Sequence, residues 1–162
     1  MEKIIKVGVA DLKVTYCPNI LTTLGLGSCV GVCLWDWRSK ISGLAHIMLP
    51  SDDGGDFSLN PMKYADTAID IELNEMLDLG ADDESITAKI IGGAHMFSHV
   101  DNDFLQVDVG GKNLEAVKKK LKEASIRIVA EDTGGEHGRS IEFYSTTGKV
   151  AVRTTTRSVK EI

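Results

Sequence analysis

A cysteine that follows two closely spaced glycines is the residue in this sequence best suited to act as a nucleophile. Gly25 and Gly27 precede Ser28 and Cys29. Glycines allow unusual backbone dihedrals and the close approach of another molecule to the main chain. A thiol directly after such a turn lies where backbone N–H groups, here those of Ser28 and Cys29, can point at a bound carbonyl oxygen. The segment therefore predicts a nucleophile beside an oxyanion-binding turn.

A histidine could lie next to this cysteine if the residues that follow form a β-hairpin. Residues 29–36 and 41–49 are both strand-like, with a turn near residues 37–39. Antiparallel pairing gives paired positions that sum to about 75 to 77, so position 29 falls opposite 46 to 48, a window that includes His46. Opposed side chains on one face have Cβ atoms about 4.5–5.5 Å apart, and a neighbouring imidazolium favours the nucleophilic thiolate. A one-residue change of register would place Cys29 and His46 on opposite faces.

A Cys–His pair is usually completed by a third group that orients the imidazole. Thr23, on the preceding strand, is the candidate, because its hydroxyl or carbonyl could accept a hydrogen bond from the ring. Thr22 is the alternative, since strand alternation places only one of the two on the face of the site. A purely structural role stays open, because a single cysteine in a strand is more often a small buried apolar residue. His46, between two apolar residues, is likewise often only a core or surface residue.

The elements that would position these residues predict a layered α+β fold in one domain over residues 1–162. The chain is long enough for one ordinary core and is 43% hydrophobic. One helix is predicted after an N-cap at Asn60, with Pro61 at its first position and Gly80 at its end, and a second over residues 113–124 with its lysines facing solvent. Short β-branched segments predict strands, and the last two form a hairpin. These strands, in a mixed sheet sandwich with the two helices, cover residues 3–9, 20–24, 29–36, 41–49, 86–91, 126–131, 140–145 and 149–155.

Charge and cysteine content exclude several classes of function. Lys and Arg total 18 and Asp and Glu total 24, so the net charge is −6. A protein that binds nucleic acid or an acidic membrane surface through charge normally has a basic surface, which this balance opposes. No apolar run is long enough for a membrane span, and the start lacks a signal-peptide pattern. An odd number of cysteines without an export signal favours reduced thiols in the cytoplasm.

Motifs that could indicate other sites are weak. His95 and His99 are four residues apart, but no third metal ligand is evident and a loop is favoured. Residues 51–60 read as one exposed loop. Cys33 is predicted to be buried and Cys17 to lie in a loop or at a strand end, whereas the position of His137 relative to the site stays open.

Two segments, Leu24-Gly25-Leu26-Gly27-Ser28-Cys29-Val30 and Ala45-His46-Ile47-Met48-Leu49-Pro50, resemble the CheD family of chemotaxis receptor glutamine deamidases. Gly92-Gly93-Ala94-His95-Met96-Phe97 and a C-terminal group are also similar to this family, so the resemblance covers nearly the whole chain in order. That group comprises Gly134, Gly135, Gly138, Arg139, Phe143 and residues 147–150. Position 95 departs from the pattern, because Asn is expected there more often than His.

The resemblance implies a fold similar to CheD and to cytotoxic-necrotizing-factor-type cysteine hydrolases. It implies Cys29 as the nucleophile, His46 as the base and Thr23 as the third member of the site. The implied reaction converts a receptor glutamine to glutamate through a thioester and releases ammonia, with no metal or organic cofactor. The implied partners are methyl-accepting chemotaxis receptors as protein substrates and a CheC-type phosphatase.

Two other functions remain open from the sequence. The protein could be mainly a non-catalytic adaptor that stimulates the CheC phosphatase. It could also be a cysteine hydrolase that acts on another amide or ester, because fold and dyad do not fix the substrate. Gly27, Met96 and Phe97 are candidate contacts for substrate or partner. For Met96 and Phe97 the sequence favours a place in the core over an exposed apolar contact.

Overall fold

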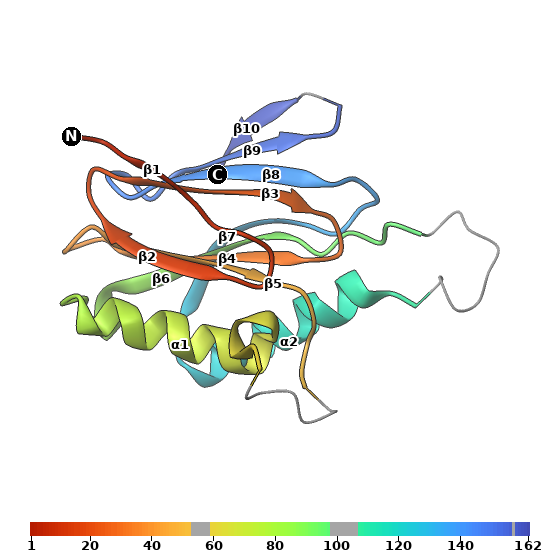
Figure 1. Ribbon diagram of the computed structural model, residues 1–162, viewed down its shortest axis with the longest axis horizontal. Coiled ribbons are helices and arrows are strands. Elements are labelled where there is room, and N and C mark those ends of the chain that lie inside the picture. The colour runs from red at the N-terminus through yellow and green to blue at the C-terminus, as the bar shows by residue number, and fades with distance from the viewer. Residues whose placement is uncertain (53–58, 98–106, 157) are drawn as a thin grey trace.

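The computed structural model describes residues 1–52, 59–97, 107–156 and 158–162, and it contains two five-stranded β-sheets and two long helices (Figure 1). The first sheet has the strand order β1-β3-β8-β9-β10, and the second has the order β2-β5-β4-β6-β7. We call them sheet A and sheet B. Sheet A consists of β1 (Ile4–Lys6), β3 (Ile20–Leu26), β8 (Arg139–Tyr144), β9 (Val150–Thr154) and β10 (Val159–Glu161). Sheet B consists of β2 (Leu12–Tyr16), β5 (Ile41–Ile47), β4 (Val30–Asp36), β6 (Ile86–Gly92) and β7 (Arg127–Thr133).

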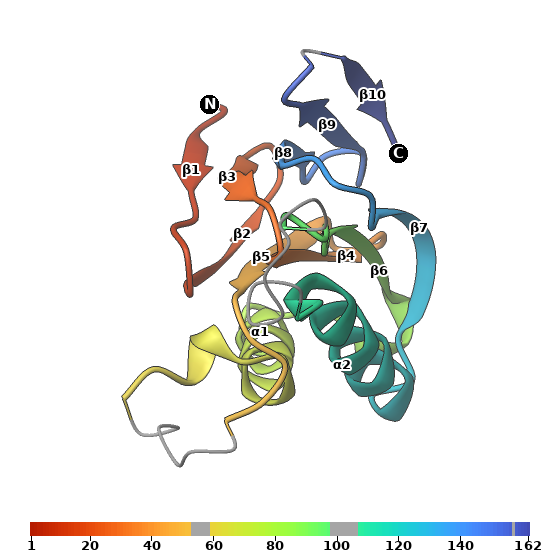
Figure 2. The ribbon, with the colours of Figure 1, turned by 90° about the vertical axis from the view of Figure 1, so that its right-hand side faces the viewer.

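Sheet B lies between sheet A and the helices, so the molecule has three layers (Figures 1 and 2). Helices α1 (Ala65–Asp78) and α2 (Val109–Glu123) lie side by side on the face of sheet B that points away from sheet A (Figure 2). The apolar side chains form one cluster between sheet B and the helices and a second between the two sheets. Because both faces of sheet B are covered, every residue of β5 is buried, including the polar residues Ser42 and His46.

The predicted layered α+β fold with two helices is confirmed. All eight predicted strands are present, with ends that differ by a few residues. Strands β2 and β10 were not predicted, because β10 is exposed along its whole length and β2 is a five-residue strand at the edge of sheet B. Strand β10 therefore has no hydrophobic signal, whereas the alternation of Leu12-Lys13-Val14-Thr15-Tyr16 in β2 is itself typical of a short strand. None of the helices in the described ranges is long and apolar enough to cross a membrane.

Both helices begin at positions that differ from the prediction. Asn60 accepts a hydrogen bond from the Met62 N–H, as an N-cap does, but it caps a short 3-10 turn (Pro61–Lys63) that precedes α1. A second such turn (Asp83–Ser85) precedes β6. Helix α2 begins at Val109 rather than Asn113, with Asp108 as its N-cap. Its first turn contains Gly110 and Gly111, which disfavour helix and so obscure its start.

Candidate active site

The register of the β4–β5 hairpin places Cys29 and His46 on the same face of sheet B. Gly31 pairs with His46 and Val30 with Ile47, so paired positions sum to 77, the upper end of the predicted range. Cys29, just before β4, is therefore not directly opposite His46 but is displaced from it by two residues. Side chains in this diagonal relation are typically about 7–8 Å apart, a separation that a long or aromatic side chain such as the imidazole can bridge. Both point toward sheet A, where Cys29 packs against the cluster between the sheets.

His46 is fully buried and its ring contacts strand β3 of the opposite sheet. Its Nδ1 lies 2.7 Å from Thr23 Oγ1. The same Thr23 hydroxyl donates a hydrogen bond of 2.8 Å to the carbonyl oxygen of Val7. Thr22, on the other face of β3, instead donates to the carbonyl of Ile141. The structure thus brings Thr23, rather than Thr22, to the imidazole.

These two contacts determine which ring nitrogen of His46 has the proton. A hydroxyl has one proton, and that of Thr23 is directed to the Val7 carbonyl. Thr23 Oγ1 must therefore accept from His46, so Nδ1 is protonated and Nε2 has the free lone pair. Nε2 is buried and has no hydrogen-bond partner among the described residues. The ring is consequently held as an acceptor at Nε2, the form that a general base requires.

Burial keeps both members of the pair uncharged near neutral pH. Loss of solvation lowers the pKa of the His46 imidazole to about 4. Burial also raises the pKa of the Cys29 thiol, and the hydrogen bond from its own backbone N–H only partly opposes this effect. Cys29 and His46 are therefore a neutral thiol and a neutral imidazole, not a preformed thiolate–imidazolium pair. The chemistry open to them is proton transfer to Nε2 as the sulfur attacks.

We call residues 25–29 the nucleophile turn. Its backbone is held by hydrogen bonds from groups that are far away in the sequence. The carbonyls of Gly27 and Cys29 each accept a hydrogen bond of 2.9 Å, from the N–H groups of Ala94 and Gly93 respectively. Gly92 has a φ of +110°, and a Cβ there would lie 2.3 Å from the Cys29 carbonyl oxygen. Only glycine fits at this position, so Gly92 allows the segment after β6 to pass against the nucleophile.

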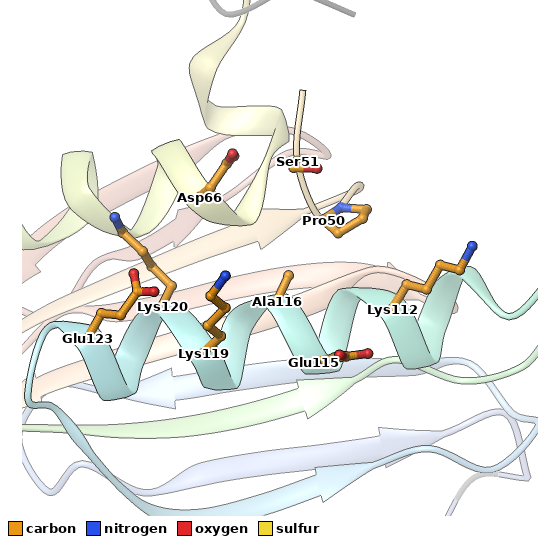
Figure 3. A pocket seen from close by; sticks show the side chains of 9 residues that line it. All are labelled: Pro50, Ser51, Asp66, Lys112, Glu115, Ala116, Lys119, Lys120 and Glu123. Carbon is orange, nitrogen blue, oxygen red and sulfur yellow. The ribbon is translucent and has the colours of Figure 1, made fainter. Parts of the chain in front are cut away.

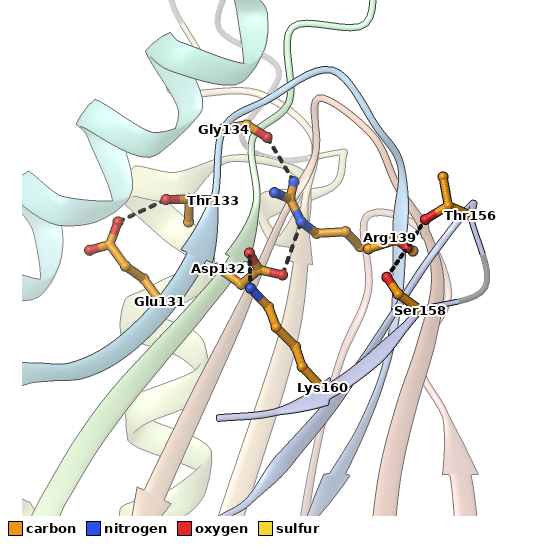
Figure 4. Close-up of polar contacts among 9 residues, drawn as sticks. Glu131, Asp132, Thr133, Gly134, Arg139, Thr156, Ser158 and Lys160 are labelled. Carbon is orange, nitrogen blue, oxygen red and sulfur yellow. Dashed lines mark hydrogen bonds and ion pairs between the residues drawn. The ribbon is translucent and has the colours of Figure 1, made fainter.

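A polar network between β7 and β8 holds that segment in turn (Figure 4). Arg139 forms a largely buried ion pair with Asp132, at 3.3 Å, and donates to the carbonyl of Gly134. Gly134 and Gly135 then pair with the backbone of Gly92 and His95 through hydrogen bonds of 2.9 and 2.8 Å. The Arg139 network therefore supports the nucleophile turn indirectly.

Two large apolar side chains lie exposed beside the turn, which makes the preference for a core position at Met96 and Phe97 wrong. Met96 is 42% exposed and Phe97 is 51% exposed. They follow the glycines after β6, where the chain has left the sheet. Met96 also lies over Gly27, whose hypothetical Cβ would be 3.2 Å from Met96 Cγ. A small cavity of about 40 Å³ beneath them is lined partly by Ser28 and His95.

The other residues considered from the sequence lie away from this pair or cannot be placed. Cys33 is buried in the core, and the Cys17 sulfur lies 3.3 Å from Thr146 Oγ1. His137 is exposed, and His99 is outside the described residues, as are 53–58 of the predicted 51–60 loop. Within the described ranges, no three His, Cys, Asp or Glu side chains are grouped so that they could hold a metal ion.

A larger depression of about 400 Å³ lies between the two helices and does not include the cysteine–histidine pair (Figure 3). Charged side chains of both signs dominate its lining: Asp66, Lys112, Glu115, Lys119, Lys120 and Glu123, together with Pro50, Ser51 and Ala116. Two of its lysines, Lys119 and Lys120, belong to the predicted solvent-facing side of α2, where Lys118, Lys119 and Lys122 are exposed.

One polar residue that contacts the site was not predicted. The side-chain amide of Asn113, in α2, donates hydrogen bonds to the carbonyls of Ser28 and Met48. The signal that could have indicated it is an asparagine just after two glycines at the start of a helix. Asn and Gly both disfavour helix, so their presence there points to a contact that requires them.

The fold and the cysteine–histidine pair define a candidate cysteine hydrolase. The family model described as CheD chemotactic sensory transduction matches residues 48–154. The chain is 49% identical to the "Probable chemoreceptor glutamine deamidase CheD" of Caldanaerobacter subterraneus subsp. tengcongensis, over 99% of each chain. It is 48% identical to the "Chemoreceptor glutamine deamidase CheD" of Halalkalibacterium halodurans, over the full length of both. The chain belongs to the CheD family.

Among solved structures, the chain has a partial likeness to the hypothetical protein YfiH of Bacillus licheniformis. The TM-score is 0.43 with 15% sequence identity, over 76% of this chain and 49% of that one. This likeness assigns no activity.

Proposed function

We propose that this protein hydrolyses the side-chain amide of glutamine residues in chemoreceptors, with Cys29 as the nucleophile and His46 as the base. The observation that carries the proposal is the Thr23–His46 hydrogen bond, which leaves Nε2 as an acceptor on the face that Cys29 shares. Full-length relatives at 48–49% identity are named chemoreceptor glutamine deamidases. The substrate class follows from those names, and the roles of the residues follow from the chemistry of the site.

The first half of the reaction forms a thioester and releases ammonia. The Cys29 sulfur attacks the carboxamide carbon while its proton passes to His46 Nε2, and the carbonyl oxygen becomes an oxyanion. Backbone N–H groups of the turn, that of Cys29 first, stabilise this charge. Protonated Nε2 then donates its proton to the departing nitrogen, the C–N bond breaks, and ammonia leaves. Thr23 holds the ring in place through both proton transfers.

The second half restores the enzyme. Water attacks the thioester carbon and gives a proton to His46 Nε2, and the C–S bond then breaks. The proton returns to the sulfur, so the products are a glutamate side chain and a neutral Cys29 thiol. The substrate glutamine becomes glutamate with no change of oxidation state and no group retained by the enzyme.

Exposed apolar side chains beside the turn support recognition of a protein rather than of a small molecule. Met96 and Phe97 are 42% and 51% exposed, and Leu24, just before Gly25, is 57% exposed. Exposed apolar side chains of this size often mark protein contacts. The net charge of −6 favours recognition of a receptor by shape and local contacts over long-range attraction. The same side chains suit a CheC-type phosphatase as a second partner, and the free cysteines suit the cytoplasm.

The proposal is tested by ammonia release from a purified receptor signalling fragment. Cys29→Ala and His46→Ala are expected to abolish release while far-UV circular dichroism stays unchanged. Cys17→Ala is the matched control, because it removes a partly exposed thiol outside the site, and it should retain full activity. Ammonia release by Cys29→Ala at the wild-type rate would refute the mechanism. A wild-type protein that stimulates a CheC-type phosphatase but releases no ammonia would instead support the adaptor function.

A further inference from the structure

Asn113 is a buried polar residue whose two donors are both used on the strands of the candidate active site. Its Nδ2 lies 2.9 Å from the Ser28 carbonyl oxygen, just before the nucleophile, and 2.8 Å from the Met48 carbonyl oxygen, just after β5. The side chain is fully buried in α2. One amide therefore links the start of the Cys29 strand to the end of the His46 strand.

The carbonyl oxygen of the Asn113 amide does not explain why an asparagine is found at this position. Asn113 Oδ1 is buried and has no hydrogen-bond partner among the described residues. Burying an unpaired acceptor is unfavourable, and an apolar residue would avoid that cost at a helix–sheet contact. The two N–H groups, and the carbonyls that they reach, are what distinguishes asparagine from such a residue here.

The hydrogen bond to Ser28 also determines the direction of the Cys29 N–H. In a trans peptide the C=O and the following N–H point in opposite directions. Because the Ser28 carbonyl points at α2, on the helical side of sheet B, the Cys29 N–H points to the other side. That is the side of the Cys29 sulfur, which packs in the cluster between the sheets. A hydrogen bond to the carbonyl also polarises the peptide, which makes its N–H a stronger donor.

The close approach of α2 that this contact needs is built into the sequence. A Cβ on Gly110 would lie 2.3 Å from the Ala94 carbonyl oxygen and 2.6 Å from atoms of the Gly93 backbone. Glycine at this position lets the first turn of α2 pack directly on the segment that supports the nucleophile turn.

We propose that Asn113 is a positioning residue that holds the Ser28–Cys29 peptide so that the Cys29 N–H faces the substrate oxyanion. This inference rests on the proposed function, because it assumes that Cys29 attacks a carboxamide. It assigns to α2 a role in transition-state stabilisation without any contact to the substrate.

The test compares two reactions of Cys29 that differ in their need for an oxyanion site. Deamidation builds negative charge on a carbonyl oxygen, whereas alkylation by iodoacetamide displaces iodide at a saturated carbon and does not. Asn113→Ala and Asn113→Asp are measured for ammonia release from a receptor fragment and for alkylation at Cys29, followed by peptide mass spectrometry. Asn74→Ala and Asn74→Asp, on the exposed side of α1, are the matched controls.

Both Asn113 variants are expected to lower kcat for ammonia release about 10- to 100-fold, because loss of a whole oxyanion donor costs about 10²- to 10³-fold and here the donor is only misdirected. KM and the alkylation rate should change less than about threefold, and the Asn74 controls should match the wild type.

Ammonia release that is unchanged, or alkylation that falls in parallel with it, would overturn the role of Asn113. So would failure of both Asn113 variants to fold while the Asn74 controls fold, because Asn113 would then serve the fold. A wild-type protein that releases no ammonia would overturn the proposed function, and the inference with it.

Discussion

Replacing Thr23 by valine removes the hydroxyl that orients His46 while nearly preserving the shape of the side chain. Two interactions are lost together: the 2.8 Å hydrogen bond to the Val7 carbonyl and the 2.7 Å contact with His46 Nδ1. Both groups are buried, so neither gains water in exchange. The substitution therefore affects stability and activity by separate routes, and their sizes can be worked out separately.

The stability effect comes mainly from the Val7 carbonyl. A buried acceptor that loses its partner costs about 1–3 kcal/mol. For a protein of this length each kcal/mol lowers the melting temperature by about 2–4 °C. Taking about 2 kcal/mol for the substitution gives an expected decrease of about 4–8 °C.

The activity effect comes from the imidazole. The hydrogen bond that favours the Nδ1-protonated form is worth about 1.4 kcal/mol, which corresponds to about a tenfold change in the balance of the two tautomers. A ring that is also free to turn loses further alignment, so kcat for ammonia release should fall about 10- to 100-fold. KM should change little, because Thr23 is buried and does not reach the substrate.

The assay is steady-state ammonia release with thermal unfolding measured on the same samples. Thr22→Val is the matched control: it removes a hydroxyl that donates 2.8 Å to the Ile141 carbonyl on the other face of β3. It should lose stability but keep wild-type kcat. Thr23→Ser keeps the hydroxyl and should stay within about threefold of wild-type activity. Equal kcat values for Thr23→Val and Thr22→Val would refute the assignment of the tautomer.

Three further predictions follow from the buried titratable groups. Burial lowers the pKa of His46 to about 4, against about 6.5 in an unfolded chain. Between these pH values the unfolded state binds a proton that the folded state does not. The free energy of unfolding should therefore fall by about 3 kcal/mol from pH 6.5 to pH 4. Urea unfolding of wild type against His46→Asn checks this, and parallel pH profiles for the two would contradict it. Because burial raises the pKa of Cys29, its alkylation rate should keep rising from pH 7 to 9, whereas a plateau would indicate a preformed ion pair. Glu72, in α1, is fully buried and its carboxyl oxygens have no hydrogen-bond partner among the described residues, and burial raises its pKa. Its protonated state is lost as pH rises, so Glu72→Gln should be more stable than wild type at pH 8 and about equal near pH 4.5. A stability difference that shrinks with rising pH would refute this.

The sequence was informative wherever a feature is local. The β4–β5 hairpin, its turn and its register range followed from two strand-like segments and a short connection. Alternation limited the third member to one of Thr22 and Thr23, but the face shared by Cys29 and His46 and the choice of Thr23 needed the register and contacts of the structure. The features that were predicted depend on residues that are near in sequence or on a period of two, which one chain is enough to reveal.

Features that depend on contacts between distant segments could not be predicted. The hydrogen bonds from Gly93 and Ala94 to the nucleophile turn join residues more than sixty positions apart, and no periodicity indicates them. Asn113 was placed only at the predicted start of a helix, because nothing local shows what its amide contacts. Hydrophobicity also failed to locate Met96 and Phe97, since apolar side chains contribute much of any protein surface.

The central claim is that the Cys29 thiol replaces the amide of a receptor glutamine with a carboxyl group. Peptide mass spectrometry of a receptor signalling fragment, incubated in parallel with wild type and Cys29→Ala, tests it most directly. A Gln-to-Glu mass gain is expected at defined glutamines with the wild type and none with the variant. The same gain with Cys29→Ala, or its absence with a folded wild type, would contradict it.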